Sequence, residues 1–338
     1  MGGFTENEIS INSNGGTELM KRMLGSRLDP VLLKNFQIIT SRVRNLEEDK
    51  IRVMYFHDLA GDPEVSKFKD KGYRDKFHHF VFISHWQYQQ FRDYLGFPFS
   101  QNCSVIEHGY DPINVDWEKK KSSKTIRFTY TSTPQRGLNI LVPVFDKFAL
   151  DKDVHLDVFS SYKIYGWDQM DQQFEPLYDQ IRNHPKMTYH GAVPHQELLE
   201  YLPTAHILAY PSTWVETSCR VMEEAMGAGL LCVHSSLGAL PDTSGHLTNM
   251  YQGDTDINVH GSIFLNELTN AYNSIINEPG VYDYLKFVKV YTDNRYHINK
   301  IIMQWTGLLN ALTQMFPDEE SRKIKDNKII IDTANPRW

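Results

Sequence analysis

The sequence predicts an α/β fold built on parallel sheets, and one stretch in the second half of the chain carries most of that prediction. The apolar run from Ile207 to Tyr210 is typical of a buried parallel strand. A helical pattern begins at Arg220 and stops near Gly227 and Gly229, and the run from Leu230 to His234 indicates the next strand. Strand, helix and strand in this order form a βαβ unit.

Length and composition narrow the class of protein. The 338 residues are enough for two domains, and 41% hydrophobic residues supply two cores. A net charge of −7 argues against non-specific binding of nucleic acid. No apolar run is long enough for a membrane span, and the N-terminus does not look like a signal peptide. Cys103, Cys219 and Cys232 show neither metal nor disulfide spacing, which favours a cytoplasmic protein.

Further strand-like runs extend the pattern over the chain. They predict a small first α/β domain after a loose polar start, and a second domain that opens with the strand 126–132. A helical region from about Ser262 through Met315 follows its last strands. The charged stretch 117–124 is interpreted as a linker whose lysines are solvated. The predicted limits are 1–118 for the first domain, 119–310 for the second and 311–338 for a tail that crosses back to the first. The strand-like runs of the first domain are 36–40, 52–57, 80–84 and 104–107.

Two carboxylates flank the start of the helix at Arg220. Glu216 precedes it and Glu224 lies inside it, while Thr217 and Ser218 are predicted N-cap residues. A helix start at the carboxyl ends of parallel strands binds anions, whereas carboxylates are strong acceptors for hydroxyl groups. A nucleotide sugar carries both phosphates and hydroxyls. The alternative for either Glu alone is dipole stabilisation or a solvated face, and the solvated face is the interpretation given to Glu223.

The spacing of these residues resembles a known family. Glu216, seven intervening residues, Glu224-Ala225-Met226 and then Gly229 resemble the EX7E signature of family 4 retaining glycosyltransferases. The segments HGAVPHQELLEYLPTAHILAYPS before it and SSLGALPDT after it are similar to that family as well. The resemblance implies a GT-B fold, with two Rossmann-like doubly wound domains that face each other across a cleft. The first domain is expected to be small or trimmed, because few residues precede its Gly-rich loop.

The resemblance also implies the sites for the donor. The diglycine Gly15-Gly16, followed by Thr17 as an expected N-cap, corresponds to a loop that closes over the donor's diphosphate or shapes the acceptor side. The alternative for the diglycine alone is a flexible linker before a helix. Arg136-Gly137-Leu138 resembles the Lys-Gly-Leu whose basic residue binds the phosphates, although the earlier Arg of the family is absent. His57 matches a histidine near the donor sugar and acceptor. The expected catalytic residues are therefore His57, Glu216 and Arg136. The expected substrate-binding residues are Gly15, Gly16, Ala192, Val193, Thr217, Ser218, Cys219, Arg220 and Glu224, with the base near Ala192 and Val193 and the ribose on Glu224.

The implied reaction is the transfer of a hexose from a nucleoside-diphosphate sugar, with UDP favoured, to an acceptor hydroxyl with retention. We expect no metal and no cofactor, because an Arg and a helix start can meet the charge of the leaving diphosphate. A nucleotide-sugar epimerase or a phosphorylase on the same fold, and a non-catalytic nucleotide-sugar-binding protein, stay open as alternatives. The acceptor is also open among a glycan, a lipid-linked sugar, a protein and a modified DNA base, as is peripheral membrane contact.

Overall fold

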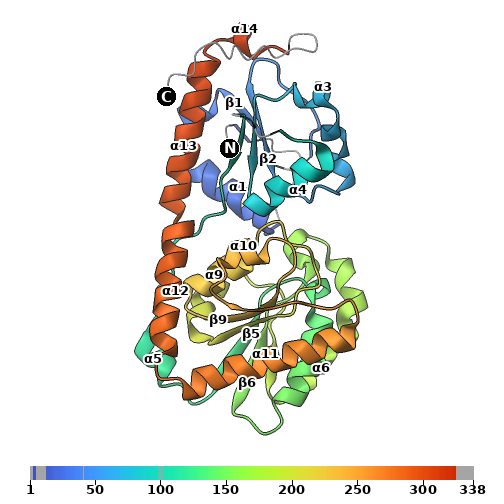
Figure 1. Cartoon of the computed structure of the whole chain (residues 1–338), viewed down its shortest axis with the longest axis vertical. Helices are drawn as coiled ribbons and strands as arrows, with labels where there is room; N and C mark the ends of the chain where they lie inside the picture. The colour runs from blue at the N-terminus through green and yellow to red at the C-terminus, as the bar shows by residue number, and fades with distance from the viewer. Residues whose placement is uncertain (1–2, 5–12, 41, 99, 101, 325–338) are drawn as a thin grey trace. The chain divides into compact units, whose positions relative to one another are not determined.

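The computed structural model describes residues 3–4, 13–40, 42–98, 100 and 102–324, and the chain forms two compact units (Figure 1). The sequence-based domain limits remain a prediction. Unit 1 comprises Met1–Ile9, Thr17–Glu107 and Asn299–Trp338, and unit 2 comprises Ser10–Gly16 and His108–Ile298.

Unit 1 is built on a four-stranded sheet in the order β1-β2-β3-β4, in which all neighbouring strands are parallel. The strands are β1 (Phe36–Ile39), β2 (Ile51–Phe56), β3 (His79–Phe82) and β4 (Cys103–Val105). Parallel neighbours require crossover connections. Those from β2 to β4 contain η1 (Pro63–Lys69), α3 (Lys71–Arg74) and α4 (His85–Leu95), while α1 (Gly16–Arg27) and α2 (Pro30–Leu33) precede the sheet.

Phenylalanine rings fill the core on one side of this sheet. Phe56 stands at the centre of the cluster, with its ring centroid 4.4 Å from that of Phe91 and 5.0 Å from that of Phe68. The helix α4 that covers them starts at Ser84, whose side chain accepts a hydrogen bond from the Gln87 amide, and ends at Gly96 in the left-handed conformation. The caps at its two ends and the packing of its buried side chains therefore both fix where α4 begins and ends.

The C-terminal part of the chain packs in unit 1 through a buried arginine. Arg52, on β2, is 0% exposed, and its guanidinium donates to the carbonyl oxygens of Lys76 at 2.6 Å and Arg322 at 2.8 Å. It also donates to the carbonyl oxygens of Glu47 and Lys50. Burial lowers the pKa of Arg52 to about 10. Because Arg322 ends α14 (Glu319–Arg322), this side chain fastens the segment after α13 (Ile298–Met315) to the sheet.

We expect the Arg52→Met variant to lose roughly 3 kcal/mol of unfolding free energy, because it leaves several buried carbonyl groups without a donor. Urea denaturation followed by circular dichroism measures this loss. Lys71→Met, which removes an exposed lysine paired with Asp75, serves as the control and should stay within about 0.5 kcal/mol of the parent chain. Equal denaturation midpoints for Arg52→Met and Lys71→Met would contradict the assignment.

Unit 2 is built on a six-stranded parallel sheet in the order β10-β9-β8-β5-β6-β7. The chain runs outward from β5 to β7 and then returns to β8 on the other side of β5. The strand order therefore reverses between β5 and β8. The strands are β5 (Ile126–Tyr130), β6 (Val154–Val158), β7 (Met187–Tyr189), β8 (Ile207–Tyr210), β9 (Leu231–Ser235) and β10 (Asn249–Tyr251).

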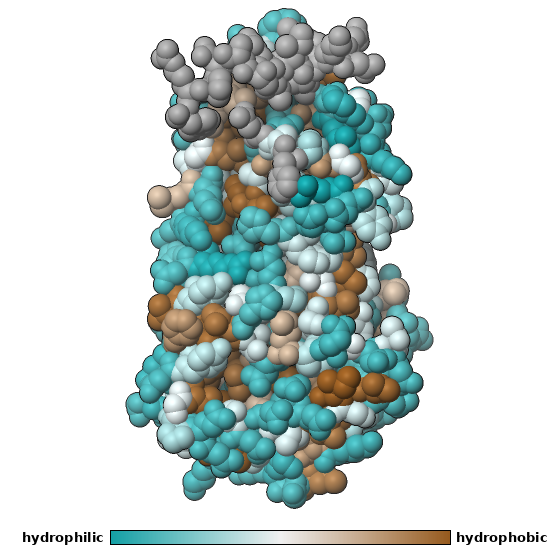
Figure 2. All heavy atoms as spheres, viewed as in Figure 1, coloured by the Kyte–Doolittle hydropathy of each residue, from teal (hydrophilic) through white to brown (hydrophobic). Residues whose placement is uncertain are grey.

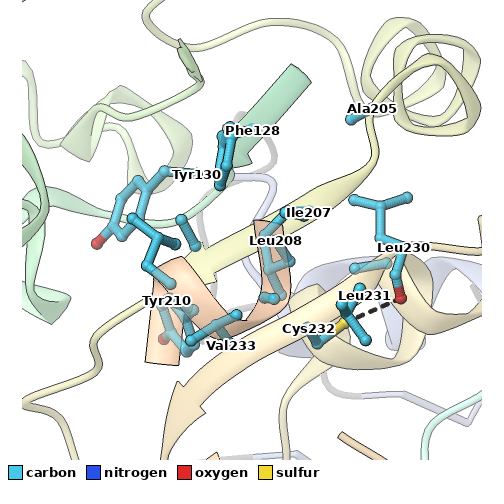
Figure 3. Close-up of a cluster of buried hydrophobic side chains, with 14 of the residues drawn as sticks. Phe128, Tyr130, Ala205, Ile207, Leu208, Tyr210, Leu230, Leu231, Cys232 and Val233 are labelled. Carbon is cyan, nitrogen blue, oxygen red and sulfur yellow. Dashed lines mark hydrogen bonds between the residues drawn. The ribbon is translucent and has the colours of Figure 1, made fainter. Parts of the chain in front are cut away.

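Helices cover this sheet, and its central strands are buried on both faces. The side chains of Phe128, Leu208 and Val233 lie in one continuous apolar cluster (Figure 3). This burial explains why β8 reads as an uninterrupted apolar run. The helices of unit 2 are α5 (Trp117–Lys121), α6 (Leu138–Phe148), α7 (Glu175–Asn183), α8 (His195–Tyr201), α9 (Arg220–Gly227), α10 (Leu240–Ser244), α11 (Ile257–Asn277) and α12 (Val281–Tyr296), with short 3-10 helices η2 (Pro134–Arg136), η3 (Tyr162–Tyr165), η4 (Asp168–Phe174) and η5 (Leu202–Thr204).

The structure corrects one sequence-based interpretation in the stretch 117–124. This stretch was predicted to carry solvated lysines, but Lys120 is buried and its Nζ donates to the carbonyl oxygens of Ala228 at 2.9 Å and Gly229 at 3.1 Å. These carbonyls end helix α9, where a positive charge is favourable. Burial lowers the pKa of Lys120 to about 7. Within this run of charged residues, Lys120 therefore has a structural role.

The surface seen in Figure 2 is mainly hydrophilic and is interrupted by separate apolar patches. Phe287 and Val290 on α12 are among the exposed apolar residues. Within the described part of the chain, none of the helices has the length and hydropathy needed to cross a membrane.

Candidate functional site

The reversal of strand order in unit 2 brings two of the predicted residues together. Arg136 follows β5 in η2, and Glu216 follows β8 in the loop that leads to α9. β5 and β8 are adjacent and parallel, so both loops leave the sheet at the same carboxyl edge. Ligands of doubly wound sheets bind at this place, where neighbouring loops diverge.

Arg136 and Glu216 form an ion pair in which the carboxylate is buried and the Arg136 side chain is 21% exposed. Nη1 of Arg136 donates to both carboxylate oxygens of Glu216, at 2.7 and 2.9 Å, and the hydroxyl of Tyr210 donates to Oε1 at 2.6 Å. Glu216 is only 4% exposed. Although burial alone lowers the pKa of Arg136, Glu216 raises it well above its usual value. Burial and the nearby carboxylate also raise the pKa of Tyr210, so that its hydroxyl stays a donor.

Two buried side-chain donors in and next to η2 have no hydrogen-bond partner among the described residues, and neither does the acceptor Oε1 of Gln135 between them. The two donors are Nε of Arg136 and Oγ1 of Thr133, at the two ends of η2. Buried polar groups are normally satisfied, so each such atom requires an explanation. An oxygen-rich ligand at the end of β5 would supply acceptors for both donors. The ring of Trp214 lies over the Arg136 guanidinium, with its centroid 5.7 Å away.

Two glycines fix the backbone around the pair. Gly137 has a φ of +109°, and a Cβ there would stand 2.0 Å from the carbonyl oxygen of Pro211. Gly238 has a φ of +65°, and a Cβ there would lie 2.5 Å from the carbonyl oxygen of Glu216. Glu216 and Gly238 also form a parallel bridge. The loops that carry Arg136 and Glu216 therefore require glycine at both positions.

The start of α9 differs from the sequence-based prediction. Cys219 occupies the N-cap position and its side chain makes no capping hydrogen bond, so the prediction of Thr217 and Ser218 as N-caps is wrong. The hydroxyl of Ser218 instead donates to Oε1 of Glu223 at 3.0 Å. The first N–H groups of a helix have no partner within it. α9 therefore starts without a side-chain cap, in the segment that follows Glu216.

Glu223 was interpreted as a residue on a solvated face, and this is wrong. It is 0% exposed, and Nδ1 of His108 lies 3.7 Å from its Oε1. The helical spacing could not show this, because residues 108–109 cover the side of α9 that periodicity alone would leave open to solvent.

Glu224 lies in a second charged cluster one turn into α9. Its Oε1 accepts from Nη2 of Arg220 at 2.6 Å and lies 2.9 Å from Nε2 of His195. Burial by itself raises the pKa of Glu224, but Arg220 and His195 outweigh it and lower the pKa to about 2. The carboxylate is therefore ionised at neutral pH and can accept hydrogen bonds from hydroxyl groups.

This pKa predicts acid sensitivity. The pKa of Glu224 in the folded chain lies below that of an unfolded Glu, so its stabilisation is present above about pH 4.3 and is lost as the pH falls towards 2. We expect the loss of unfolding free energy to reach about 2 kcal/mol between pH 6 and pH 3, measured by urea titration, because pH 3 still lies above the pKa of Glu224 in the folded chain. Glu224→Gln should flatten this part of the profile. An unchanged slope in Glu224→Gln would show that other carboxylates cause it.

The structure places the other predicted donor residues in unit 2 as well. Gly15 and Gly16 precede and begin α1, and Gly16 packs against the Arg220 side chain. Ala192 and Val193 lie between β7 and α8, just before His195. The bond between His195 and Glu224 therefore connects the loop predicted to hold the base with the carboxylate predicted to hold the ribose. In the described residues, no three His, Cys, Asp or Glu side chains gather as a metal site would require.

His57 lies in unit 1, directly after β2. Its ring packs edge-on against Tyr55, with centroids 4.3 Å apart, and Tyr55 packs in the same way against Trp305 of α13 at 4.9 Å. Sequence reasoning did not find Tyr210, His195 or Trp305. Tyr210 and Trp305 read as core residues, and a lone histidine in a polar segment gives no signal.

Comparison with known proteins finds one family match, in unit 2, and several solved structures that are similar over most of the chain. Residues 125–261 match the family described as Glycosyl transferases group 1, and no curated protein matches the chain. Among solved structures, a glycosyltransferase from Rickettsia africae is similar with a TM-score of 0.65 and 12% identity, over 92% of this chain and 84% of that one. Sucrose-phosphate synthase from Thermosynechococcus elongatus is similar with a TM-score of 0.61 and 14% identity, over 88% of this chain and 79% of that one. Anabaena HepE, solved with UDP-glucose, is similar with a TM-score of 0.59 and 13% identity, over 87% of this chain and 82% of that one.

The chain has the GT-B fold. This confirms the predicted fold class of two Rossmann-like α/β domains, although likeness at such low identity establishes the fold alone. The segment that matches group 1 glycosyl transferases contains Arg136, Glu216 and Glu224. The assignment to family 4 and the roles of the individual residues remain predictions.

Proposed function

We propose that the protein is a retaining glycosyltransferase that moves a hexose from a nucleoside-diphosphate sugar, with UDP favoured, to an acceptor hydroxyl. The observation that carries the proposal is the ion pair between Arg136 and the buried Glu216 before the start of α9, inside the segment that matches group 1 glycosyl transferases. It offers a cation for phosphate and a carboxylate for sugar hydroxyls within one pair of side chains.

The donor would rearrange this pair. Nη1 of Arg136 donates to both carboxylate oxygens of Glu216. A diphosphate would take hydrogen bonds from the Arg136 guanidinium, including the unpartnered Nε, and from the first N–H groups of α9. Sugar hydroxyls would then donate to the Glu216 carboxylate, which Tyr210 keeps in place. On Glu224, the ribose hydroxyls would find an acceptor that is already ionised.

The chemical step needs stabilisation of the leaving diphosphate more than it needs a nucleophile. Charge develops on the phosphate as the glycosidic bond breaks, and fixed donors aimed at it lower the barrier. In the proposed mechanism, the acceptor hydroxyl attacks from the face on which the phosphate departs and gives its proton to that phosphate. His57 would donate to a sugar oxygen, and no metal ion would take part.

Release of UDP from a panel of UDP-sugars, with and without acceptor sugars, tests this proposal. We expect acceptor-dependent release that persists in EDTA, with the anomeric configuration of the product conserved in its NMR spectrum. A change of sugar configuration without any acceptor would indicate an epimerase. Tight binding of UDP-sugars without turnover, over a broad range of acceptors, would indicate a non-catalytic binding protein.

A further inference from the structure

Arg220 stands at a position where its charge is unfavourable. It is the first residue of α9, and the positive end of a helix dipole repels a cation. The side chain is nevertheless only 7% exposed, so solvent does not compensate for this repulsion. Its contacts must therefore account for the choice of residue.

Two parts of the proposed donor site and the backbone of Gly109 meet on this side chain. Nη2 donates to Oε1 of Glu224 at 2.6 Å, and Nη1 donates to the carbonyl oxygen of Gly109 at 2.9 Å. The methylene group Cδ packs under Gly16, where an added Cβ would lie 3.5 Å from it. A planar guanidinium can make two such hydrogen bonds in fixed directions, which the single ammonium of a lysine cannot.

The diglycine loop is held on its other side as well. The amide of Asn14 and the hydroxyl of Ser13 donate to the carbonyl oxygen of Ile164 in η3, at 2.5 and 3.2 Å. The loop therefore lies between η3 and Arg220, and Arg220 connects it with the carboxylate assigned to the ribose.

We propose that Arg220 is a positioning residue that aligns Glu224, which holds the nucleoside, with the diglycine loop, which holds the diphosphate. The proposal rests on the proposed function, and it concerns the side chain of Arg220 and not its backbone N–H. Loss of the guanidinium should weaken recognition of both ends of the donor. Loss of His195, whose Nε2 lies 2.9 Å from Glu224, should weaken recognition of the nucleoside end only.

Isothermal titration with uridine and with UDP separates the two effects, because the ratio of the two affinities measures the phosphate contribution. We expect Arg220→Met to weaken uridine binding about tenfold and UDP binding about a hundredfold. Arg220→Lys should recover uridine binding, because a lysine can still pair with Glu224. Its ratio of UDP affinity to uridine affinity should stay below that of the parent chain. His195→Leu should weaken uridine and UDP equally. Lys286→Met, which removes a partly exposed cation from α12, is the matched control and should bind like the parent chain.

The outcomes are distinguishable. If the parent chain binds UDP but Arg220→Met keeps the parental ratio of the two affinities, the proposal for Arg220 is wrong and the proposed function stands. If circular dichroism shows that Arg220→Met does not fold, the comparison is made between Arg220→Lys and His195→Leu. The same ratio of UDP affinity to uridine affinity in these two variants would overturn the proposal. If the parent chain binds neither uridine nor UDP, the preference for a UDP donor has failed.

Discussion

The Arg136→Met variant is expected to lower kcat by about 100- to 1000-fold, which corresponds to roughly 3–4 kcal/mol of transition-state stabilisation. Arg136 is the cation placed at the end of β5, and the leaving diphosphate gains negative charge as the sugar departs. The change also leaves Glu216 buried, with the Tyr210 hydroxyl as its remaining donor of those described above. Steady-state rates of UDP release, with the folded fraction determined by circular dichroism, measure the effect.

The double variant Arg136→Met with Glu216→Gln tests whether the two side chains act as a unit. Because the partners are in direct contact at 2.7 Å, their effects should not add. We expect the double variant to be more stable than Arg136→Met alone, since it no longer buries an unpaired carboxylate, but equally inactive. Recovery of activity in the double variant would mean that Arg136 serves stability and not the reaction.

The positions of these residues show how far the sequence could lead. Residues 207–210 and 220–227 were predictable, because a buried strand and an amphipathic helix each leave a periodic pattern and the glycines mark the helix end. The pairing of Arg136 with Glu216 was not predictable from spacing, since 80 residues separate them along the chain. It depends on β8 returning beside β5, and strand order is a property of the whole sheet.

The burial of charged side chains was the property that was hardest to predict from the sequence. Glu223 and Glu224 are neighbours in one helix, and both are buried, although a helical pattern would expose at least one of them. His108 and Ser218 lie beside Glu223, whereas Arg220 and His195 contact Glu224. His108 and His195 come from distant segments, so the sequence alone suggests a solvated acid where the folded chain buries a paired one.

Two glycines of the site allow a sharp final test, because the fold needs one of them and not the other. At Gly137 a methyl group would meet the Pro211 carbonyl oxygen at 2.0 Å, and a φ of +109° is strained for any other residue. We expect Gly137→Ala to lose at least about 3 kcal/mol of unfolding free energy and to shift the loop of Arg136, with loss of activity as a consequence.

At Gly16 a methyl group would make an ordinary contact of 3.5 Å with the Arg220 side chain, and the residue begins a helix. Gly16→Ala should therefore leave the melting temperature unchanged or raise it, since Ala reduces the entropy of the unfolded chain by an amount worth about 0.4–1 kcal/mol. It should nevertheless weaken UDP binding at least tenfold, because the diglycine is proposed to let the diphosphate approach the backbone closely. Parental UDP affinity in a fully folded Gly16→Ala protein would remove the diglycine loop from the donor site. Gly280→Ala, at a position with open space around it, is the control, because it makes the same change to the entropy of the unfolded chain and should keep the parental UDP affinity.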